Sequence, residues 1–387
     1  MNARRLLGLV VVGVLLALSG PAILDARQAR LNLRERSEAL ELVALVDETA
    51  RGKPPGGAAW LKWRYHFLRG TEGRTYIPFT LRIDEAPDAF DSVALYVRLS
   101  RVGGERRSID QANAPAAFDM PTGGEMLPAS VPESQFGTPG IPTAGEHSMA
   151  LNSVAAALID RPRHAFEDIH FVADLHDRSE PPYEIVRAIE IPPGAYDVYL
   201  AVLERDPSVD VGEAHRTAVM KQRLVVPDFG AVRLRTSSLL LADAIAPLER
   251  PLSDTEQRER PYALGLAEVE PAADVLFDPS EEMTVAFFVY NATTGEGGKP
   301  DVRIDYQFVE RGLTERVVSR TPPQVLDATT LPADFDLAAG HQLATSQTVP
   351  LASFAQGDYR LRVTVTDRLS GETAVEQIEF SVRPGAE

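Results

Sequence analysis

Cysteine is absent from this sequence of 387 residues. The absence excludes disulfide bonds, thiolate metal sites, a catalytic cysteine and a lipid-modified N-terminal cysteine. The chain does not need disulfide bonds to fold. Its length accommodates two domains of roughly 150 residues each, and domains of that size bury around 70% of the surface that their unfolded chains expose.

Positive charge is scarce. Lys and Arg number 39 against 56 Asp and Glu, which gives a net charge of −17. Such an excess of negative charge favours solubility and argues against nucleic acid or an anionic membrane surface as a partner. We therefore expect no nucleic-acid partner, although charge alone does not identify the partner that the protein does have.

Signatures of catalysis are missing as well. The sequence has no G-x-S-x-G nucleophile elbow, no H-E-x-x-H helix, no Walker loop and no dinucleotide-binding glycine pattern. Glu146, His147 and Ser148 are adjacent, but neighbours in sequence do not make a catalytic dyad without a third orienting group. Paired carboxylates of the glycosidase type stay open, because 56 acidic residues always offer pairs. We predict that the protein is not an enzyme and has no catalytic, cofactor-binding or metal-binding residues.

Residues 1–26 read as a signal peptide or a membrane anchor. Arg4 and Arg5 precede an apolar run at 6–18, and small residues follow at 19–22. The uncharged run continues to residue 24, which is just long enough to span a bilayer. Cleavage and anchorage both remain open, and both place the bulk of the protein outside the cytoplasm, in the periplasm or beyond. Membrane contact is then expected only through this segment.

Residues 27–57 form a charged segment of good helix formers that ends in a Pro-Pro-Gly-Gly linker. Leu33, Leu40 and Val43 give barely one heptad of apolar spacing. The pattern predicts a short amphipathic or frayed helix, and it is too short for a coiled coil.

Two stretches of the chain share a pattern of Gly, any residue and Tyr, followed by alternating apolar residues. They are residues 191–204, with Tyr196, and residues 354–367, with Tyr359. The alternation predicts a strand with one buried face. A Tyr just before a late strand is typical of the tyrosine corner of immunoglobulin-like sandwiches. We predict an all-β protein with two such sandwiches in tandem, each Tyr being buried with its hydroxyl bonded to nearby backbone.

The first predicted sandwich covers residues 58–228 and the second covers residues 229–387. A long connection at residues 103–145, rich in Pro, Gly, Ser and Ala, interrupts the first. It is either a functional loop or disordered. Besides the two tyrosine strands, the first domain has predicted strands at residues 63–68, 75–83, 92–99, 169–173, 185–191 and 217–226. The second has them at residues 234–242, 263–269, 284–290, 302–309, 316–318, 342–350 and 374–382.

Three histidines, His164, His170 and His176, recur every six residues and raise the question of a metal site. On a strand, neighbouring members would lie about 20 Å apart, far beyond the reach of one ion. We interpret them as surface or hydrogen-bonded histidines. Asp174 and Asp177 beside His176 stay open as part of a site that other residues would complete.

Three further groups have a functional and a structural interpretation. Asp206, Asp210 and Glu213 lack the ligand spacing and central Gly of a calcium loop, so a solvated hairpin is favoured. Trp60, Trp63 and Tyr65 flank the first strand and would either stack on a sugar or peptide or pack in the core, which we favour. Asn291-Ala292-Thr293 is a glycosylation sequon that chance also produces.

The second domain resembles the C-terminal half of a family of exported, functionally uncharacterised bacterial proteins. The segments that resemble it are RPYALG at 260–265, FFVYN at 287–291, LPADFDLAAGHQL at 331–343 and VPLASFAQGDYRLRVTVTD at 349–367. The chain is also similar there to the tails of GWxTD-domain proteins, although no Gly-Trp-x-Thr-Asp motif is present. The resemblance covers roughly residues 195–382. It implies a bacterial cell envelope and tandem β-sandwiches, and it assigns no catalytic residues.

These observations together predict a non-catalytic, extracytoplasmic protein that acts as an interaction or scaffold module, with another envelope or extracellular protein as its partner. The alternative is a carbohydrate-binding or hydrolase-accessory protein with a site near residues 103–145. A pocket lined by convergent carboxylates, or by Trp60, Trp63 and Tyr65, would favour the alternative.

Overall fold

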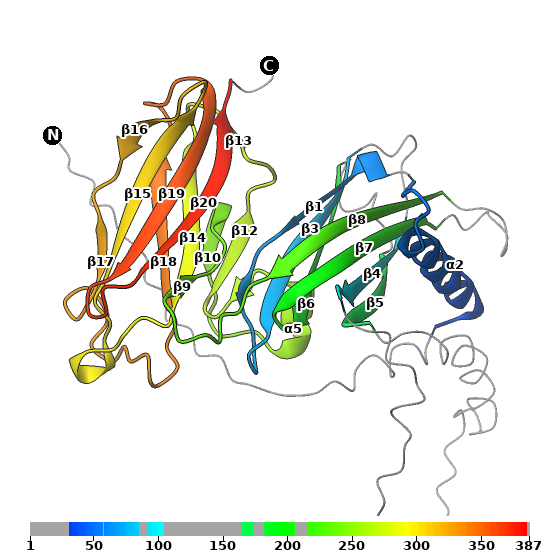
Figure 1. Cartoon of the computed structure of the whole chain (residues 1–387), viewed down its shortest axis with the longest axis horizontal. Helices are drawn as coiled ribbons and strands as arrows, with labels where there is room; N and C mark the ends of the chain where they lie inside the picture. Colours follow the sequence, from blue (N-terminus) through cyan, green and yellow to red (C-terminus); the bar gives the residue numbers. More distant parts are fainter. Residues whose placement is uncertain are drawn as a thin grey trace, which may run out of the picture.

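A computed structural model of the chain describes residues 31–56, 58–84, 92–103, 164–172, 182–205 and 216–384. The described chain is mostly β, as predicted, with strands in four sheets (Figure 1). All strand pairs are antiparallel except the short pair between β13 (Leu276–Phe277) and β20 (Thr373–Val382). The helical elements are α2 (Leu33–Ala50), α5 (Asp254–Glu259), η1 (Ala58–Trp60) and η3 (Glu296–Gly298).

Helix α2 differs from the short or frayed helix that the sequence predicts. It has 18 residues and begins at Asn32, whose side chain accepts from the Glu35 backbone N–H while the Glu35 carboxylate accepts from the Asn32 N–H. This capping box satisfies two donors that the first turn leaves free. Leu42 and Val46 make the buried face, whereas Leu33 is 82% exposed. Of the three apolar residues of the heptad pattern, Val43 packs against this face, whereas Leu40 is 41% exposed.

The first β unit consists of two facing sheets. Sheet I contains β1 (Leu61–Tyr65), β2 (Leu68–Arg69), β3 (Thr75–Ile83) and β6 (Tyr183–Ile191). Sheet II contains β4 (Val93–Arg101), β5 (Phe166–Val172), β7 (Gly194–Glu204) and β8 (Thr217–Val226). Alternate residues of both sheets meet in one core, for example Ile77 and Phe79 from β3 with Leu95 and Val97 from β4.

The central strands β4 and β7 of sheet II are buried on both faces because α2 covers their outer side, whereas Val225 on β8 is 70% exposed. Leu42 and Val46 of the helix pack on Tyr96 of β4 and on Tyr199 of β7. This explains why the sequence of β4 is almost continuously apolar, because a strand that is covered on both sides has no face in contact with water.

The second β unit has the same two-sheet build. Sheet III contains β9 (Arg235–Thr236), β10 (Leu240–Pro247), β11 (Ala263–Leu264), β12 (Ala267–Pro271), β14 (Glu282–Tyr290) and β18 (Leu343–Pro350). Sheet IV contains β13, β15 (Val302–Arg311), β16 (Arg316–Arg320), β17 (Gln324–Leu326), β19 (Gly357–Asp367) and β20. Their inner faces enclose the largest core of the molecule, which includes Phe287, Tyr306, Phe308 and Phe380.

The order of the longer strands is the same in both units. In the first, β6–β3–β1 faces β8–β7–β4–β5, and in the second, β18–β14–β10 faces β20–β19–β15–β16. The sequence predicted most of these strands to within a few residues. The exception is the strand expected at 234–242, which covers β9 and only the first three residues of β10. It missed β2, β13 and β17, which have two or three residues each and are too short to show a period of two.

The prediction for the two tyrosines is confirmed. The Tyr196 hydroxyl donates to the Pro192 carbonyl at 2.7 Å, and the Tyr359 hydroxyl donates to the Ala355 carbonyl at 2.6 Å. Both side chains are buried, at 0% and 2% exposure. The Gly before Tyr196 has φ = +149°, a conformation that strongly favours glycine.

Candidate functional site

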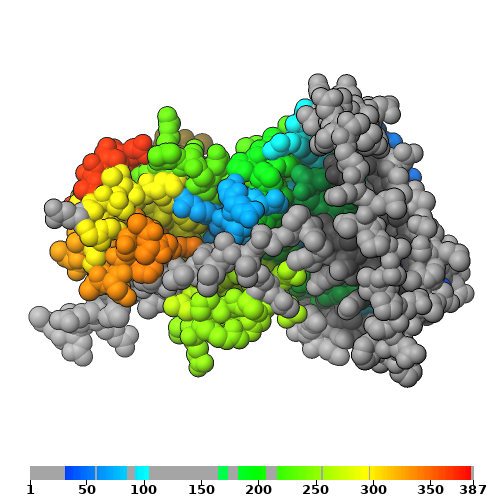
Figure 2. Space-filling view, turned by 90° about the horizontal axis from the view of Figure 1, so that it is seen from below, coloured from blue at the N-terminus to red at the C-terminus, as the bar shows by residue number. Residues whose placement is uncertain are grey.

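The outer faces of three sheets are covered by another element or carry ion pairs between charged side chains. Helix α2 covers sheet II. Sheet IV carries ion pairs on its outer face, such as Arg311–Glu379 at 2.6 Å and Arg360–Glu315 at 2.6 Å. Sheets I and III face each other, and Figure 2 shows the light-blue residues of β1 to β3 directly against the second unit. One part of sheet III is left open beside this contact.

The contact between sheets I and III, here called the junction, has a polar part with partners far apart in sequence. His66 Nδ1 lies 2.9 Å from the Tyr262 hydroxyl. The Tyr76 hydroxyl donates to the Pro261 carbonyl at 2.9 Å. Phe67 N–H donates to the Ser238 hydroxyl at 2.8 Å, and Ser238 N–H donates to the Phe67 carbonyl at 2.9 Å. The two units are therefore joined through specific groups on both sides.

Arg69 makes several contacts with the second unit at one end of the junction. Its guanidinium donates to the Phe229 carbonyl at 2.9 Å and to the Asn291 side chain, and it lies 4.5 Å from the centre of the Tyr290 ring. The Tyr290 hydroxyl accepts from the Arg69 backbone N–H at 3.1 Å. Burial of Arg69 lowers the pKa of its guanidinium, and burial of Tyr290 raises the pKa of its hydroxyl. The hydrogen bonds and the ring contact together hold the half-buried Arg69 guanidinium in place.

Burial also determines the protonation state of His66, the histidine of the junction. The pKa of His66 is lowered to about 4, mainly because burial disfavours the charged imidazolium and secondly because Arg64 is nearby. His66 is therefore neutral at pH 7. The pKa of the Tyr262 hydroxyl is raised by burial as well.

The apolar part of the junction leads into the open surface. Leu240, Tyr262 and Val269 are buried there, and Val186 of sheet I packs against them. Ile245 and Leu264 belong to the same cluster.

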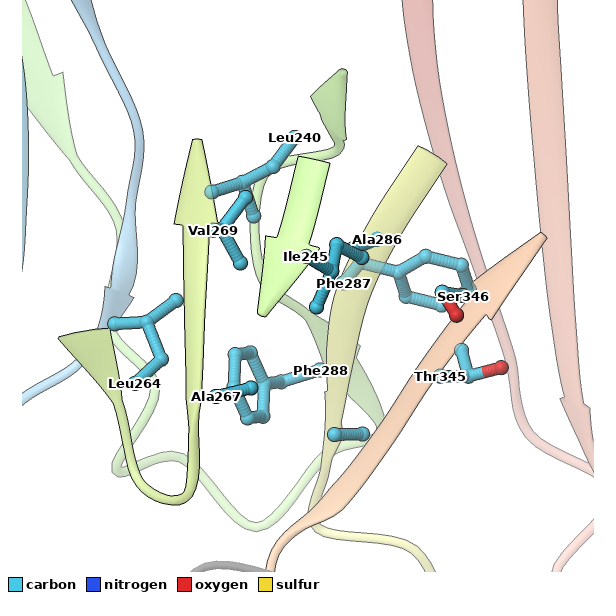
Figure 3. Close-up of a pocket in the computed structure, with 11 residues that line it drawn as sticks. Leu240, Ile245, Leu264, Ala267, Val269, Ala286, Phe287, Phe288, Thr345 and Ser346 are labelled. Atoms are coloured by element: carbon cyan, nitrogen blue, oxygen red, sulfur yellow. The ribbon is translucent and has the colours of Figure 1, made fainter. Parts of the chain in front are cut away.

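Beyond this cluster lies an apolar depression, here called the hollow, with a volume of about 440 Å³ that includes space open to solvent. In Figure 3 its lining comes from β11 and β12 on one side, from β10 and β14 in the middle and from β18 on the other. The residues that line it are Leu240, Ile245, Leu264, Ala267, Val269, Ala286, Phe287, Phe288, Ala344, Thr345 and Ser346.

The lining has no charged residue, and its polar groups are two hydroxyls on β18. The Thr345 hydroxyl donates to the Gln324 side chain at 2.7 Å, so it is already used. A surface of this kind offers neither acid–base nor metal chemistry, and it is suited to apolar groups. Among the described residues, no group of three or more His, Cys, Asp or Glu is placed to hold a metal ion.

The structure does not bring the described candidate histidines together. His164 is 3.1 Å from the Ser100 hydroxyl, and His170, on β5, pairs with Asp168 at 2.9 Å. The other candidates of this kind lie outside the described residues, as does nearly all of the connection at 103–145; they are Glu146, His147, Ser148, Asp174, His176, Asp177, Asp206, Asp210 and Glu213.

The aromatic group at the first strand packs inward. Trp60, Trp63 and Tyr65 are partly buried against the core of the first unit, together with Phe67. The ring centres of Trp63 and Tyr65 are 4.3 Å apart. Burial raises the pKa of the Tyr65 hydroxyl. This arrangement agrees with the core-packing interpretation.

Asn291 of the sequon has a structural role that sequence reasoning missed. Its amide donates to the carbonyls of Ala231 at 2.6 Å, Arg233 at 2.9 Å and Phe229 at 3.3 Å, while its oxygen accepts from Arg69. Its φ is +60°, which Asn tolerates better than most residues. The amide nitrogen that a glycan would need is thus held in three hydrogen bonds.

Sequence reasoning also missed the hollow, although one signal was available. On β14, Ala286 and Phe288 point to the face that should be wet, as do Ala344 and Ser346 on β18. Apolar and small residues at these positions contradict the alternation that a solvated face predicts.

Comparison with models of known protein families and with curated proteins finds no match. In the described part of the chain, no helix is long and apolar enough to cross a membrane. Residues 1–30 lie outside it.

Proposed function

We propose that this protein is a non-catalytic, extracytoplasmic interaction or scaffold protein of the bacterial cell envelope, which binds a partner protein through the hollow. The hollow is the observation that carries this proposal. It is an open, uncharged and concave surface on a molecule whose other described sheet faces are covered or carry ion pairs. Concave apolar sites with few polar groups are typical of binding sites in proteins.

We further propose that the two β units are immunoglobulin-like sandwiches in tandem. The strand order supports this, because in each unit three of the longer strands in one sheet face four in the other, β6–β3–β1 against β8–β7–β4–β5 and β18–β14–β10 against β20–β19–β15–β16. The tyrosine corners support it too, since Tyr196 and Tyr359 begin the equivalent strands β7 and β19. Such folds bind proteins as readily as they bind other ligands, so the fold by itself does not decide the function.

A scaffold role is supported by the junction. Hydrogen bonds of His66, Phe67, Arg69 and Tyr76 to the second unit fix the hollow relative to sheet I. A site on rigid strands keeps its shape when a partner approaches, which lowers the entropic cost of binding.

The extracytoplasmic location is supported by the apolar segment within residues 1–26 and by the resemblance to exported bacterial proteins. The alternative, a carbohydrate-binding or hydrolase-accessory protein, gains no support from the hollow, because no carboxylate lines it and Trp60, Trp63 and Tyr65 pack elsewhere.

The test uses the full chain as bait in an extract of cell-envelope proteins, with quantitative mass spectrometry of what it captures. In Ala286→Glu a charge enters the hollow, and we expect the specifically bound proteins to be lost. The control is Val375→Glu, which adds the same charge at an exposed position of β20. Equal capture by the wild type and both variants, with melting temperatures unchanged, would contradict the proposed function.

A further inference from the structure

We propose that the partner enters the hollow as an extended segment, which adds to the free edge of β18 as a further strand of sheet III. Its alternate side chains are apolar and extend over the β18 end of the hollow. This inference rests on the proposed function and names the form and chemistry of the partner.

The edge of β18 is open on one side. Within the described part of the chain, β18 pairs with β14 and with no other strand. Leu351 N–H donates to the Glu281 carbonyl at 3.0 Å, directly beyond the last pair of this ladder. Because hydrogen-bonded and non-hydrogen-bonded pairs alternate in an antiparallel ladder, odd-numbered residues of β18 direct their backbone groups to β14. The backbone groups of Ala344, Ser346 and Thr348 therefore point to the free edge, where the Thr348 carbonyl accepts from the Gln347 side chain at 3.0 Å.

The same three residues place their side chains on the outer face, next to the hollow. Ala344 lies opposite Phe288, and Ser346 lies opposite Ala286. An added strand would hold its own side chains about 5 Å from those of Ala344 and Ser346. Both are small, so larger apolar side chains of the added strand have room above them.

The absence of charge distinguishes β18 from the other edge strands. Its sequence, LATSQTVP, has no charged residue. Charges on edge strands prevent unwanted pairing, and each other described edge strand of five or more residues outside sheet III has at least two. Those strands and charges are β1 with Lys62 and Arg64, β5 with Glu167 and Asp168, β6 with Glu184, Arg187 and Glu190, β8 with Lys221 and Arg223, β16 with Arg316 and Arg320, and β20 with Glu376 and Glu379.

The chemistry of the occupant follows from the junction, which is continuous with the hollow. Leu240, Ile245, Leu264 and Val269 line the hollow and also belong to the cluster on which Val186 of sheet I packs. One end of this surface thus already holds an aliphatic side chain from a β-strand. The other end fits aliphatic side chains from a second strand.

A second copy of the chain fits less well than a different protein. Two β18 strands paired antiparallel about Ser346 would place Ala344, Ser346 and Thr348 opposite one another. Small side chains would then meet small side chains, and both hollows would remain empty. The geometry therefore assigns the edge to a strand with bulky apolar residues at alternate positions.

The test uses a labelled peptide of ten residues that alternates Val and Thr between terminal Lys residues, with fluorescence anisotropy as the readout. A second peptide of the same sequence has methyl groups on alternate backbone nitrogens and cannot pair on that edge. We expect the full chain to bind the first peptide at least tenfold more tightly than the second. Amide hydrogen exchange at Ala344, Ser346 and Thr348 should slow when the first peptide is present.

Ser346→Pro removes a backbone donor at the free edge without breaking the ladder to β14, and we expect at least a tenfold loss of peptide binding. Val375→Pro is the matched control. Ser381 N–H donates to the Val275 carbonyl on the outer side of β20, so odd-numbered residues there point away from β19 and Val375 has the same position at an edge. Equal binding by the wild type and Ser346→Pro would overturn the inference.

The two proposals fail in different ways. If Ala286→Glu abolishes capture of envelope proteins while Ser346→Pro leaves it intact, the hollow binds a partner but strand addition is wrong. If neither variant changes capture, the proposed function is wrong as well. A wild-type dimer that Ser346→Pro converts to a monomer, measured by light scattering, would assign the edge to a second copy and overturn the inference of a different partner.

Discussion

His66 Nδ1 and the Tyr262 hydroxyl lie 2.9 Å apart although 196 positions separate the two residues in sequence. His66 lies between β1 and β2 of the first unit, and Tyr262 directly precedes β11 of the second. Because the two residues belong to different units, this contact forms only when both units are folded and docked.

Stability should depend on pH through His66. Its folded pKa of about 4 lies below the ordinary value of 6.5, so the unfolded chain binds the extra proton between these values. The contribution of His66 to stability is complete above pH 6.5 and is lost as pH falls towards 4. We expect it to fall by about 2 kcal/mol between pH 7 and pH 5.

The measurement is urea unfolding of the wild type and His66→Asn at both pH values. The variant keeps a polar atom near the position of Nδ1 and cannot titrate, so its free energy of unfolding should vary less with pH. His341→Asn, which alters a histidine of a turn in the second unit, serves as control. A wild-type pH dependence that persists in His66→Asn would show that another group is responsible.

The two units should unfold together. Two separate cores predict two transitions, but the junction couples them through Arg64, His66, Arg69 and Tyr76. Tyr359→Phe leaves the Ala355 carbonyl without its donor and should cost about 1–3 kcal/mol. Calorimetry should show one transition, lowered by this variant and by Tyr196→Phe alike. Separate melting of the first unit in Tyr359→Phe would show that the junction does not couple the cores.

Asn291→Ala should destabilise the protein more than Asn291→Gly does. Both variants leave the carbonyls of Ala231 and Arg233 without their donor, at a cost of about 1–3 kcal/mol. Ala adds about 1 kcal/mol because the residue has φ = +60°, which Gly adopts freely. Thermal unfolding of both variants measures the difference, and equal melting temperatures would indicate that the loop changes conformation.

The ion pair between α2 and sheet II should respond asymmetrically to mutation. Arg98 is 2% exposed and Asp47 is 32% exposed, and Arg98 also lies 5.1 Å from the centre of the Tyr199 ring. Asp47→Ala leaves a buried charge without its carboxylate and should cost about 3–5 kcal/mol. Arg98→Met leaves Asp47 near solvent and should cost much less. Equal losses in urea unfolding would mean that both groups depend on the pair to the same degree.

The sequence was a good guide to the strands and a poor guide to what covers them. Alternating residues such as Leu361, Val363 and Val365 on β19 predict a strand and its buried face, because a period of two follows from backbone geometry. The corner bonds of Tyr196 and Tyr359 span four residues and are equally local. These features could be predicted since each depends on neighbours in sequence.

The junction and the hollow depend on residues that only the complete fold brings together. Nothing local to His66 indicates Tyr262, and nothing local to Phe288 indicates Ser346 or Leu264. Helix α2 illustrates the same limit, because sheet II rather than the helical pattern decides that Leu42 and Val46 are its buried face. Packing between elements overrides a weak periodic signal.

The layers of the molecule set the distance between helix α2 and the hollow on sheet III. Figure 1 shows α2, sheet II, sheet I and sheet III following one another across the molecule. Layers of this kind pack about 10 Å apart, so roughly 30 Å separates α2 from sheet III. The first β unit therefore acts as a rigid spacer between α2 and the hollow, because hydrogen bonds across the junction hold sheet I against sheet III.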